Sequence, residues 1–237
     1  MTVAERHGEI LARIAAACAR AGRDPSQVRL LGATKQVPPE AIREAHKAGL
    51  RIVGENRLQE ALPKLDALAD LPGLEWHFIG PIQSRKARDV ARRFACAQSV
   101  DREKVARLLS QHAAEAGRRL RVLVEVNVGG EGSKTGCPPG EAEALVRLCA
   151  ELPALEPAGL MAVPPFTDDP EAGRPFHRRL RALRDALRDR LGMPGLRELS
   201  TGMSRDYEIA VEEGATIVRV GTTLFGPRPA AQERADD

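Results

Sequence analysis

Short apolar segments typical of buried strands recur along this chain, and each is followed by a segment whose apolar residues have helical spacing. The clearest is 121–128, where valine occupies every second position from 122 to 128. The predicted strands are 28–34, 52–54, 75–79, 95–100, 121–128, 157–162, 196–199 and 216–220. This alternation implies parallel strands joined by right-handed crossover helices.

The predicted helices follow from the same periodicity and from turn residues at their ends. One helix, 3–21, precedes the first strand and ends at Gly22 and Pro25. Asp101 is expected to cap the helix that it begins. The helices expected after the strands are 38–49, 56–68, 83–92, 101–116, 138–152, 170–191 and 204–213.

Eight such units in about 210 residues suit an α/β fold of the closed (β/α)8 type better than an open sheet. A flavodoxin- or Rossmann-like sheet is the alternative, but no Gly-x-Gly-x-x-Gly motif follows the first strand. No linker-like change of composition interrupts the chain. A single domain over 1–237 is therefore expected, with a flexible tail at about 229–237.

Composition excludes several kinds of partner. The formal net charge is only +3, so total charge does not require nucleic acid, and no apolar run approaches the roughly 20 residues of a membrane span. The N-terminus has no signal-peptide core, which favours a cytoplasmic protein. The arginine-rich segment 177–190 is predicted to be a solvated outer helix with local ion pairs. An RNA-binding face, the alternative, would need aromatic residues that this segment nearly lacks.

The four cysteines are Cys18, Cys96, Cys137 and Cys149. No two have the C-x-x-C spacing of a zinc site or a redox pair, so neither a metal nor a disulfide is predicted. Buried free thiols are expected instead. Cys137, in a loop rich in glycine and proline, is the one expected to be most reactive.

A set of polar side chains is predicted to point into the barrel, because side chains alternate in direction along a strand. Each member lies at or near the carboxyl end of a strand, where barrel enzymes build their sites. Buried Arg and Lys are costly without a partner or a ligand. For each residue alone, a structural hydrogen bond or a solvent-reaching lysine is the simpler alternative. The set is Lys35, Asn56, His77, Asn127 and Arg219.

Two loops have the composition of an anion site. Residues 199–204 supply hydroxyls and a glycine before a helix, and 221–223 follow the last strand. Barrels often hold phosphate between the loops after strands seven and eight, although Ser200 or Ser204 could simply cap a helix. A lysine across the barrel from a phosphate site fits a phosphorylated aldehyde held as a Schiff base, with pyridoxal 5′-phosphate (PLP) as the candidate. Arg219 would then donate to the pyridine nitrogen without transferring a proton, which disfavours strong carbanion chemistry.

Several segments, in this order along the chain, resemble the pyridoxal phosphate homeostasis proteins, the YggS/PROSC family. The fold of that family is similar to the N-terminal domain of alanine racemase. The resemblance covers roughly residues 5–228. It is carried by 33–35, 54–56, 59–60, 76–80, 83–86, 126–127, 134–136, 159–162, 200–206, 218–222 and 225–226.

The resemblance implies a barrel that carries and buffers PLP, without established catalytic turnover. It implies Lys35 as the Schiff-base lysine and Arg219 beside the ring nitrogen. Ser200, Gly202, Gly221 and Thr222 are implied around the phosphate, and Asn56, Met161 and Met203 along the ring. His77, Asn127 and Thr201 are further candidates for the pocket lining. The implied partners are PLP and apo forms of PLP enzymes, and the implied state is a monomer or a weak dimer.

The chain departs from the family pattern at several positions. Val37 stands where a second lysine is common, two residues after the Schiff-base lysine, which puts any transfer role of such a lysine in doubt here. Thr201 stands where methionine is common, and Pro81-Ile82 where His-Leu is common. These changes concern the pocket wall more than its chemistry.

Two other functions stay open on the sequence. A racemase of the alanine racemase kind uses the lysine and a tyrosine contributed with a second, C-terminal domain. This chain ends shortly after the eighth strand, and its one tyrosine, Tyr207, is predicted to pack or cap a helix. The other alternative keeps the barrel without PLP, as a lysine Schiff-base aldolase or a phosphosugar binder.

Overall fold

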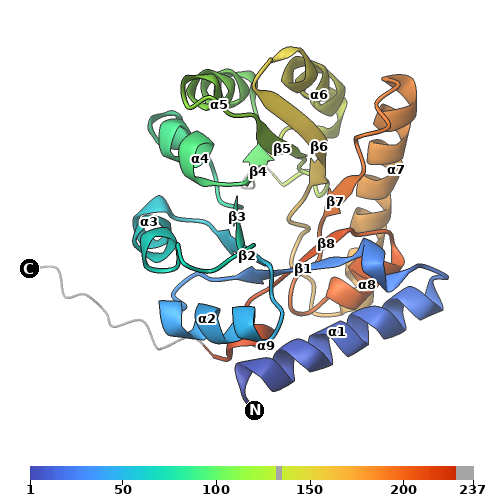
Figure 1. Cartoon of the computed structure of the whole chain (residues 1–237). Helices are drawn as coiled ribbons and strands as arrows, with labels where there is room; N and C mark the ends of the chain where they lie inside the picture. The colour runs from blue at the N-terminus through green and yellow to red at the C-terminus, as the bar shows by residue number, and fades with distance from the viewer. Residues whose placement is uncertain (132–134, 228–237) are drawn as a thin grey trace, which may run out of the picture.

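Eight parallel strands close into a barrel in the computed structural model, which describes residues 1–131 and 135–227 (Figure 1). Each strand pairs with the next, and β8 pairs in parallel with β1. The predicted (β/α)8 fold is therefore confirmed over an open sheet. The strands are β1 Arg29–Ala33, β2 Ile52–Glu55, β3 Glu75–Phe78, β4 Cys96–Val100, β5 Leu120–Glu125, β6 Leu155–Met161, β7 Glu198–Ser200 and β8 Ile217–Val220.

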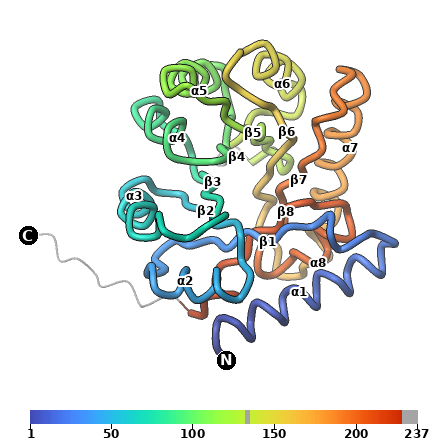
Figure 2. The backbone as a smooth tube through the Cα atoms, in the orientation of Figure 1, coloured from blue at the N-terminus to red at the C-terminus, as the bar shows by residue number. Residues whose placement is uncertain are grey.

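Helices follow the strands and form an outer ring around them, as the chain trace in Figure 2 shows. They are α2 Pro39–Lys47, α3 Leu58–Ala67, α4 Ala87–Arg93, α5 Glu103–Glu115, α6 Ala142–Glu151, α7 Arg174–Arg190, α8 Tyr207–Glu212 and α9 Thr222–Phe225. Short 3-10 turns precede α4, α6 and α7. The predicted cap of α5 is wrong: Arg102 is the N-cap residue, and the Asp101 carboxylate accepts a hydrogen bond from the Arg102 guanidinium at 2.6 Å instead.

The N-terminal helix α1, Val3–Arg20, packs outside the barrel against α2, α8 and α9. It buries Ile10, Ile14 and Ala17, which recur at helical spacing. The helix after β8 is only four residues long, so α1 covers the side of β1 and β8 that a full eighth helix would cover (Figure 1). The predicted extra helix is thus part of the outer layer.

The barrel interior contains a small apolar cluster of its own. Side chains from alternating strand positions meet there, and the larger cluster lies between the strands and the helices. The valines of β5 belong to that outer cluster, while Leu123 points inward, so the predicted alternation is confirmed. The inner cluster is Leu31, Ile52, Cys96, Leu123, Ala158, Met161 and Ile217, with Ile79 packed against it.

The arginine-rich helix α7 is held by ion pairs, as predicted. Arg174 contacts Glu171, Glu212 and Glu213, and Arg184 pairs with Asp185 at 2.7 Å. Leu180 and Leu187 are buried, and Arg184 lies between them on the same buried face of the helix. Local carboxylates therefore compensate much of the positive charge of this segment.

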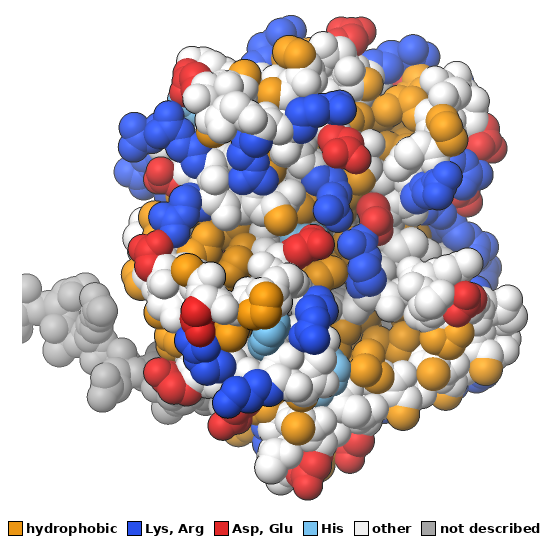
Figure 3. Space-filling view, in the orientation of Figure 1, with side chains coloured by type: hydrophobic (Ala, Val, Ile, Leu, Met, Phe, Trp, Pro, Cys, Tyr) orange, Lys and Arg blue, Asp and Glu red, His pale blue; other side chains and the backbone are white. Residues whose placement is uncertain are grey.

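Charges of both signs are mixed over the surface. Figure 3 shows Lys and Arg side chains interspersed with Asp and Glu over one face of the molecule, in keeping with the small net charge. Within residues 1–131 and 135–227, no helix is long and apolar enough to cross a membrane.

All four cysteines are buried and unpaired, as predicted. The expectation that Cys137 is the reactive one is not supported. Its thiol is buried, and burial raises its pKa to about 12, which keeps it protonated.

A buried ion pair fixes the end of β1. Lys64 of α3 donates to the carboxylate of Glu55 and to the carbonyl oxygen of Thr34, both at 2.7 Å, and the Thr34 hydroxyl also donates to Glu55 at 2.7 Å. The Glu55 side chain is fully buried and that of Lys64 is 10% exposed. Since Thr34 directly precedes Lys35, this cluster anchors the backbone from which Lys35 extends.

We predict that Lys64→Met lowers the free energy of unfolding by about 3 kcal/mol, because it leaves a buried carboxylate without its cation. Urea unfolding at neutral pH measures the change. Lys104→Met, at an exposed position of α5, is the matched control and should change stability by less than about 0.5 kcal/mol. Adding Glu55→Leu to Lys64→Met should recover most of the loss, and equal stability of Lys64→Met and wild type would contradict the assignment.

Candidate functional site

A cavity of about 370 Å³ opens at the carboxyl ends of the strands, where barrel proteins build their sites. Its walls come from β1 and β8, from the residues directly after β2, β3 and β8, and from the loops that follow β6 and β7. The lining residues are Ala33, Asn56, Ile79, Val163, Pro165, Phe166, Thr167, Pro170, Met203, Ser204, Arg205, Asp206, Arg219, Gly221 and Thr222.

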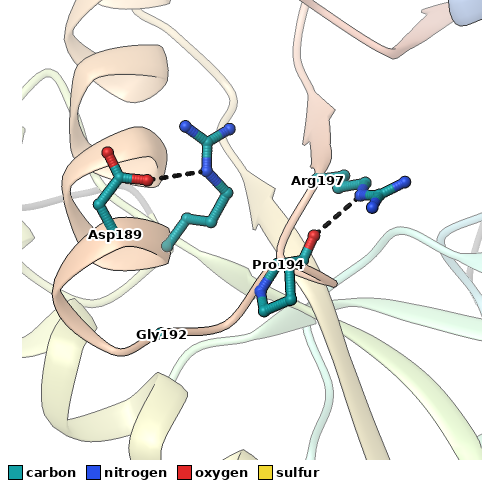
Figure 4. A pocket seen from close by; sticks show the side chains of 5 residues that line it. Asp189, Gly192, Pro194 and Arg197 are labelled. Carbon is teal, nitrogen blue, oxygen red and sulfur yellow. Dashed lines mark hydrogen bonds and ion pairs between the residues drawn. The ribbon is translucent and has the colours of Figure 1, made fainter.

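A second hollow lies at the opposite end of the barrel, between the end of α7 and the start of β7 (Figure 4). Its two arginines are engaged: Arg188 pairs with Asp189 at 3.0 Å, and Arg197 donates to the carbonyl oxygen of Pro194 at 2.8 Å. None of the polar residues predicted for the site lies here. The first cavity is therefore the candidate site.

Arg219 lies on the floor of the candidate cavity and is 5% exposed. Its guanidinium donates to the backbone oxygen and hydroxyl of Ser200 at 2.9 and 2.8 Å, and to the carbonyl oxygen of Ala162 at 2.8 Å. Burial lowers the pKa of this group to about 10, so it stays charged at neutral pH. A guanidinium carries five N–H groups, so two remain without a partner among the described residues and can meet a ligand.

Asn56 supplies a second unsatisfied polar group on the cavity wall. Its side-chain oxygen is buried and has no hydrogen-bond partner within the described part of the chain. The loop after β3 closes over this residue at Gly80, where a Cβ atom would lie 2.3 Å from the Asn56 carbonyl oxygen. Only glycine permits this approach. Buried polar groups normally have partners, so Asn56 and Arg219 both indicate a polar ligand in the cavity.

Lys35 lies in a tight turn directly after β1. The Val37 amide donates to the Thr34 carbonyl oxygen at 3.0 Å, and Gln36 has a positive φ of 59°, which is rare outside glycine. The carboxylate of Glu60 accepts a hydrogen bond from the Gln36 amide at 3.1 Å and helps to hold this conformation. Lys35 is half-buried and does not itself line the cavity, whereas Ala33, the last residue of β1, does.

The loops after β7 and β8 meet at one wall of the cavity. The Gly221 amide donates to the Ser204 hydroxyl at 3.4 Å, and Thr222 follows at the start of α9. Gly202 has a φ of 90°, and a Cβ atom there would lie 2.4 Å from Ala210, so glycine is required. The sequence had suggested that these loops face Lys35 from across the barrel. Because β1 pairs with β8, they lie instead next to the strand that precedes Lys35.

Asp206 adds a partly buried carboxylate to the same wall, with 17% of its side chain exposed. It accepts hydrogen bonds from the Met203 amide at 2.6 Å and from the imidazole of His177 at 3.1 Å. The other ring nitrogen of His177 contacts the Thr201 hydroxyl at 2.9 Å. Burial opposes ionisation of Asp206, but the hydrogen bonds from His177 and Met203 outweigh it and lower its pKa.

Comparison with known proteins agrees with this geometry. A family model, alanine racemase N-terminal domain, matches residues 9–229. The pyridoxal phosphate homeostasis protein of Aquifex aeolicus is 47% identical over 228 residues, which cover 96% of this chain and 99% of the relative. That of Pseudomonas aeruginosa is 50% identical over 227 residues, which cover 96% of each chain.

The chain belongs to the pyridoxal phosphate homeostasis protein family. A solved structure of PipY from Synechococcus elongatus with PLP bound is similar to it, with a TM-score of 0.82 and 35% sequence identity. The match covers 95% of this chain and all of the PipY chain. The resemblance found in the sequence is therefore confirmed, and so is the alanine racemase-like barrel.

The residues expected at the family's site occupy two levels of the barrel. Those that line the cavity are Asn56, Met203, Arg219, Gly221 and Thr222. Met161, Ser200 and His77 are buried in the barrel interior, and Thr201 and Gly202 lie behind the wall. Asn127 lies in the loop after β5, where it donates to the Glu131 carbonyl oxygen and accepts from the Gly130 amide. Lys134, part of one matching segment, is outside the described residues.

One wall of the cavity was not expected from the sequence. The loop between β6 and α7 supplies Val163, Pro165, Phe166 and Thr167. Phe166 is 69% exposed, and the Arg205 guanidinium lies 4.9 Å from its ring centre. An aromatic residue beside prolines at a strand's carboxyl end is the signal that would have indicated this wall.

We predict that Asp206 makes the free energy of unfolding sensitive to acid. A carboxyl group whose pKa is lowered in the folded state stabilises the protein above its unfolded pKa, here near 3.8, and this stabilisation is lost as pH falls through the folded pKa. Between about pH 5 and about pH 3, wild type should therefore lose stability more steeply than Asp206→Asn. Urea midpoints across this range measure it. Asp66→Asn, at a 68% exposed carboxylate, is the control and should follow wild type.

Proposed function

We propose that this chain binds PLP as a Schiff base on Lys35 and serves in PLP homeostasis, without catalytic turnover. The observation that carries the proposal is Arg219. It is a buried, charged guanidinium on the floor of the cavity with two N–H groups left for a ligand. The PLP-bound relative, PipY, and the names of the curated relatives support the choice of ligand.

Arg219 suits the pyridine nitrogen of PLP because it can only donate. An arginine stays protonated at working pH, so it binds an unprotonated ring nitrogen without transferring a proton to it. When bound, PLP supplies an aldehyde and an electron sink, and the sink is weaker when the ring nitrogen carries no proton. This arrangement favours holding the cofactor over carbanion chemistry.

Lys35 is suited to the covalent link by its place in the fold. Lys35 would hold the cofactor through its Nζ amine, and PLP would supply the aldehyde with which an amine condenses, releasing water. The turn that carries Lys35 is anchored by Lys64, Glu55 and Glu60. This anchoring limits the positions from which the amine approaches the cavity.

The phosphate is proposed to lie against Ser204, Gly221 and Thr222. Their backbone amides and hydroxyls line one wall, and backbone N–H groups suit a phosphate oxygen. Gly202 shapes this wall from behind, through its close approach to Ala210. Ser200, which the resemblance put near the phosphate, has its hydroxyl fully buried beneath Arg219, so we assign it to the ring end of the site.

The absence of turnover is proposed from the lack of a suitable second base. Racemisation by two bases needs an acid–base group on the substrate face opposite the lysine. Asp206 is the carboxylate among the described lining residues, and its lowered pKa makes it a weak base. Tyr207 is 1% exposed, packs at the start of α8 and does not line the cavity.

Lys35→Ala should abolish covalent trapping of PLP. Borohydride reduction of PLP-loaded wild type, followed by peptide mass mapping, should label Lys35, and the variant should lose the label and the visible absorbance. Lys47→Ala, at an exposed lysine of α2, is the control and should be labelled at Lys35 like wild type. Equal labelling of Lys35→Ala at another residue would show the lysine assignment to be wrong.

PLP-loaded protein incubated with single enantiomers of amino acids should show no sustained racemisation, because no described group is set to act as the second base. Chiral chromatography over many hours measures the enantiomer ratio, with an alanine racemase as the positive control. Repeated racemisation at a rate above that of free PLP would contradict the carrier proposal. Delivery to apo PLP enzymes, a cytoplasmic location and a monomeric or weakly dimeric state stay predictions.

A further inference from the structure

A continuous chain of hydrogen bonds crosses the barrel interior from the cavity floor to the other end of the strands. Arg219 donates to the Ser200 hydroxyl at 2.8 Å, and Ser200 lies 2.6 Å from the Gln98 side-chain oxygen. The Gln98 amide nitrogen lies 2.7 Å from Nδ1 of His77, and Nε2 of His77 lies 3.2 Å from the Glu75 carboxylate. These residues come from β3, β4, β7 and β8.

The residues of this hydrogen-bond network are buried, with one exception. Gln98, His77 and Ser200 are each 0% exposed, and Arg219 is 5% exposed. Only Glu75, at the first position of β3, reaches solvent, with 40% of its side chain exposed. Buried polar groups are costly unless each is satisfied, so every link in this chain is under strong geometric constraint.

The two ends of this network set the direction of its bonds, because Arg219 can only donate and the Glu75 carboxylate can only accept. Nε2 of His77 therefore carries the proton that is donated to Glu75. In the neutral ring Nδ1 must then accept, which turns the NH₂ group of Gln98 toward His77 and leaves the Gln98 oxygen to accept the Ser200 proton. The Ser200 oxygen in turn accepts from Arg219.

The surroundings of His77 are consistent with a neutral ring. Burial lowers its pKa, and Arg121 and Arg29 lower it further, although Glu75 opposes them. A second proton on Nδ1 would point at the Gln98 NH₂ group, which has no lone pair to accept it.

We propose that Gln98 is a positioning residue for Arg219. It holds the Ser200 hydroxyl on one side and the Nε2-protonated form of His77 on the other, and so fixes the guanidinium that faces the cavity. This inference rests on the proposed function, in which Arg219 contacts the pyridine nitrogen of PLP. Gln98 does not line the cavity, and it acts on the ligand only through Ser200 and Arg219.

Gln98→Leu tests the proposal, because leucine fills a similar volume and can neither accept from Ser200 nor donate to His77. We expect release of PLP to become about tenfold faster or more, as one support of a charged group is lost. The visible absorbance band of bound PLP should also shift, a change that general destabilisation does not produce. Val90→Ala removes buried volume from α4 and changes no residue of the hydrogen-bond network. It should leave the rate of PLP release and the absorbance band unchanged.

Gln98→Glu tests the contact of residue 98 with Ser200 separately from its contact with His77. Its carboxylate still accepts from Ser200, so PLP release and absorbance should stay within about twofold of wild type. On the other side it requires a proton on Nδ1 of His77. Nitrogen-15 NMR of the ring should therefore show protonated Nδ1 in this variant, and an acceptor-type Nδ1 in wild type.

Three results would overturn the inference. The first is wild-type release and absorbance in a folded Gln98→Leu variant, and the second is a proton on Nδ1 of His77 in wild type. If Gln98→Leu does not fold, Ser200→Ala removes the same link, and unchanged release in that variant is the third. Borohydride labelling of wild-type Lys35 alongside keeps the two proposals apart: labelling with unchanged release defeats only the role of Gln98, whereas no labelling defeats the proposed function.

Discussion

The pairing of β8 with β1 is the contact on which the rest of this molecule depends. It aligns Leu31 with Arg219 and Gly32 with Val220, and so joins the first and last strands of the barrel. Ala33, two residues before Lys35, thereby lies beside Gly221, where a Cβ atom would be 3.4 Å from the Ala33 carbonyl oxygen, although the two residues are far apart in the sequence. Without this closure the two ends of the proposed PLP site would not meet.

The site combines a rigid floor with walls that contain no strong base. Below the cavity, the polar chain and the Lys64–Glu55 pair use buried groups that must be satisfied. Above it, glycine, proline and hydroxyl side chains give shape and donors without strong bases. Such a division suits a protein that retains a reactive aldehyde. A rigid floor favours binding, and walls without a strong base limit turnover.

The strand–helix alternation was enough to predict the barrel, and strand parity correctly turned Arg219 and His77 inward. Parity also puts Gln98 on the inner face, two residues after Cys96 of the inner cluster, but Gln98 lies in the middle of β4, away from the carboxyl ends at which the site was expected. Parity could not place Asn127, since β5 ends at Glu125 and the direction of a loop side chain has no period. The cavity wall formed by the loop between β6 and α7 was not predicted for the same reason. Loops carry functional residues, but their sequences lack the periodicity from which strands and helices are predicted.

The position of α1 has a consequence for the order in which the chain can fold. This helix is synthesised well before its partners α8 and α9, and Arg13 and Arg20 contact Glu208 and Glu212 across sequence separations of 195 and 192 residues. Its apolar face therefore has no complete surface to cover until α8 and α9 have been synthesised. Barrel closure and docking of the N-terminal helix thus belong to the same late event, so cooperativity links the two ends of the chain through the outer layer as well as through the sheet.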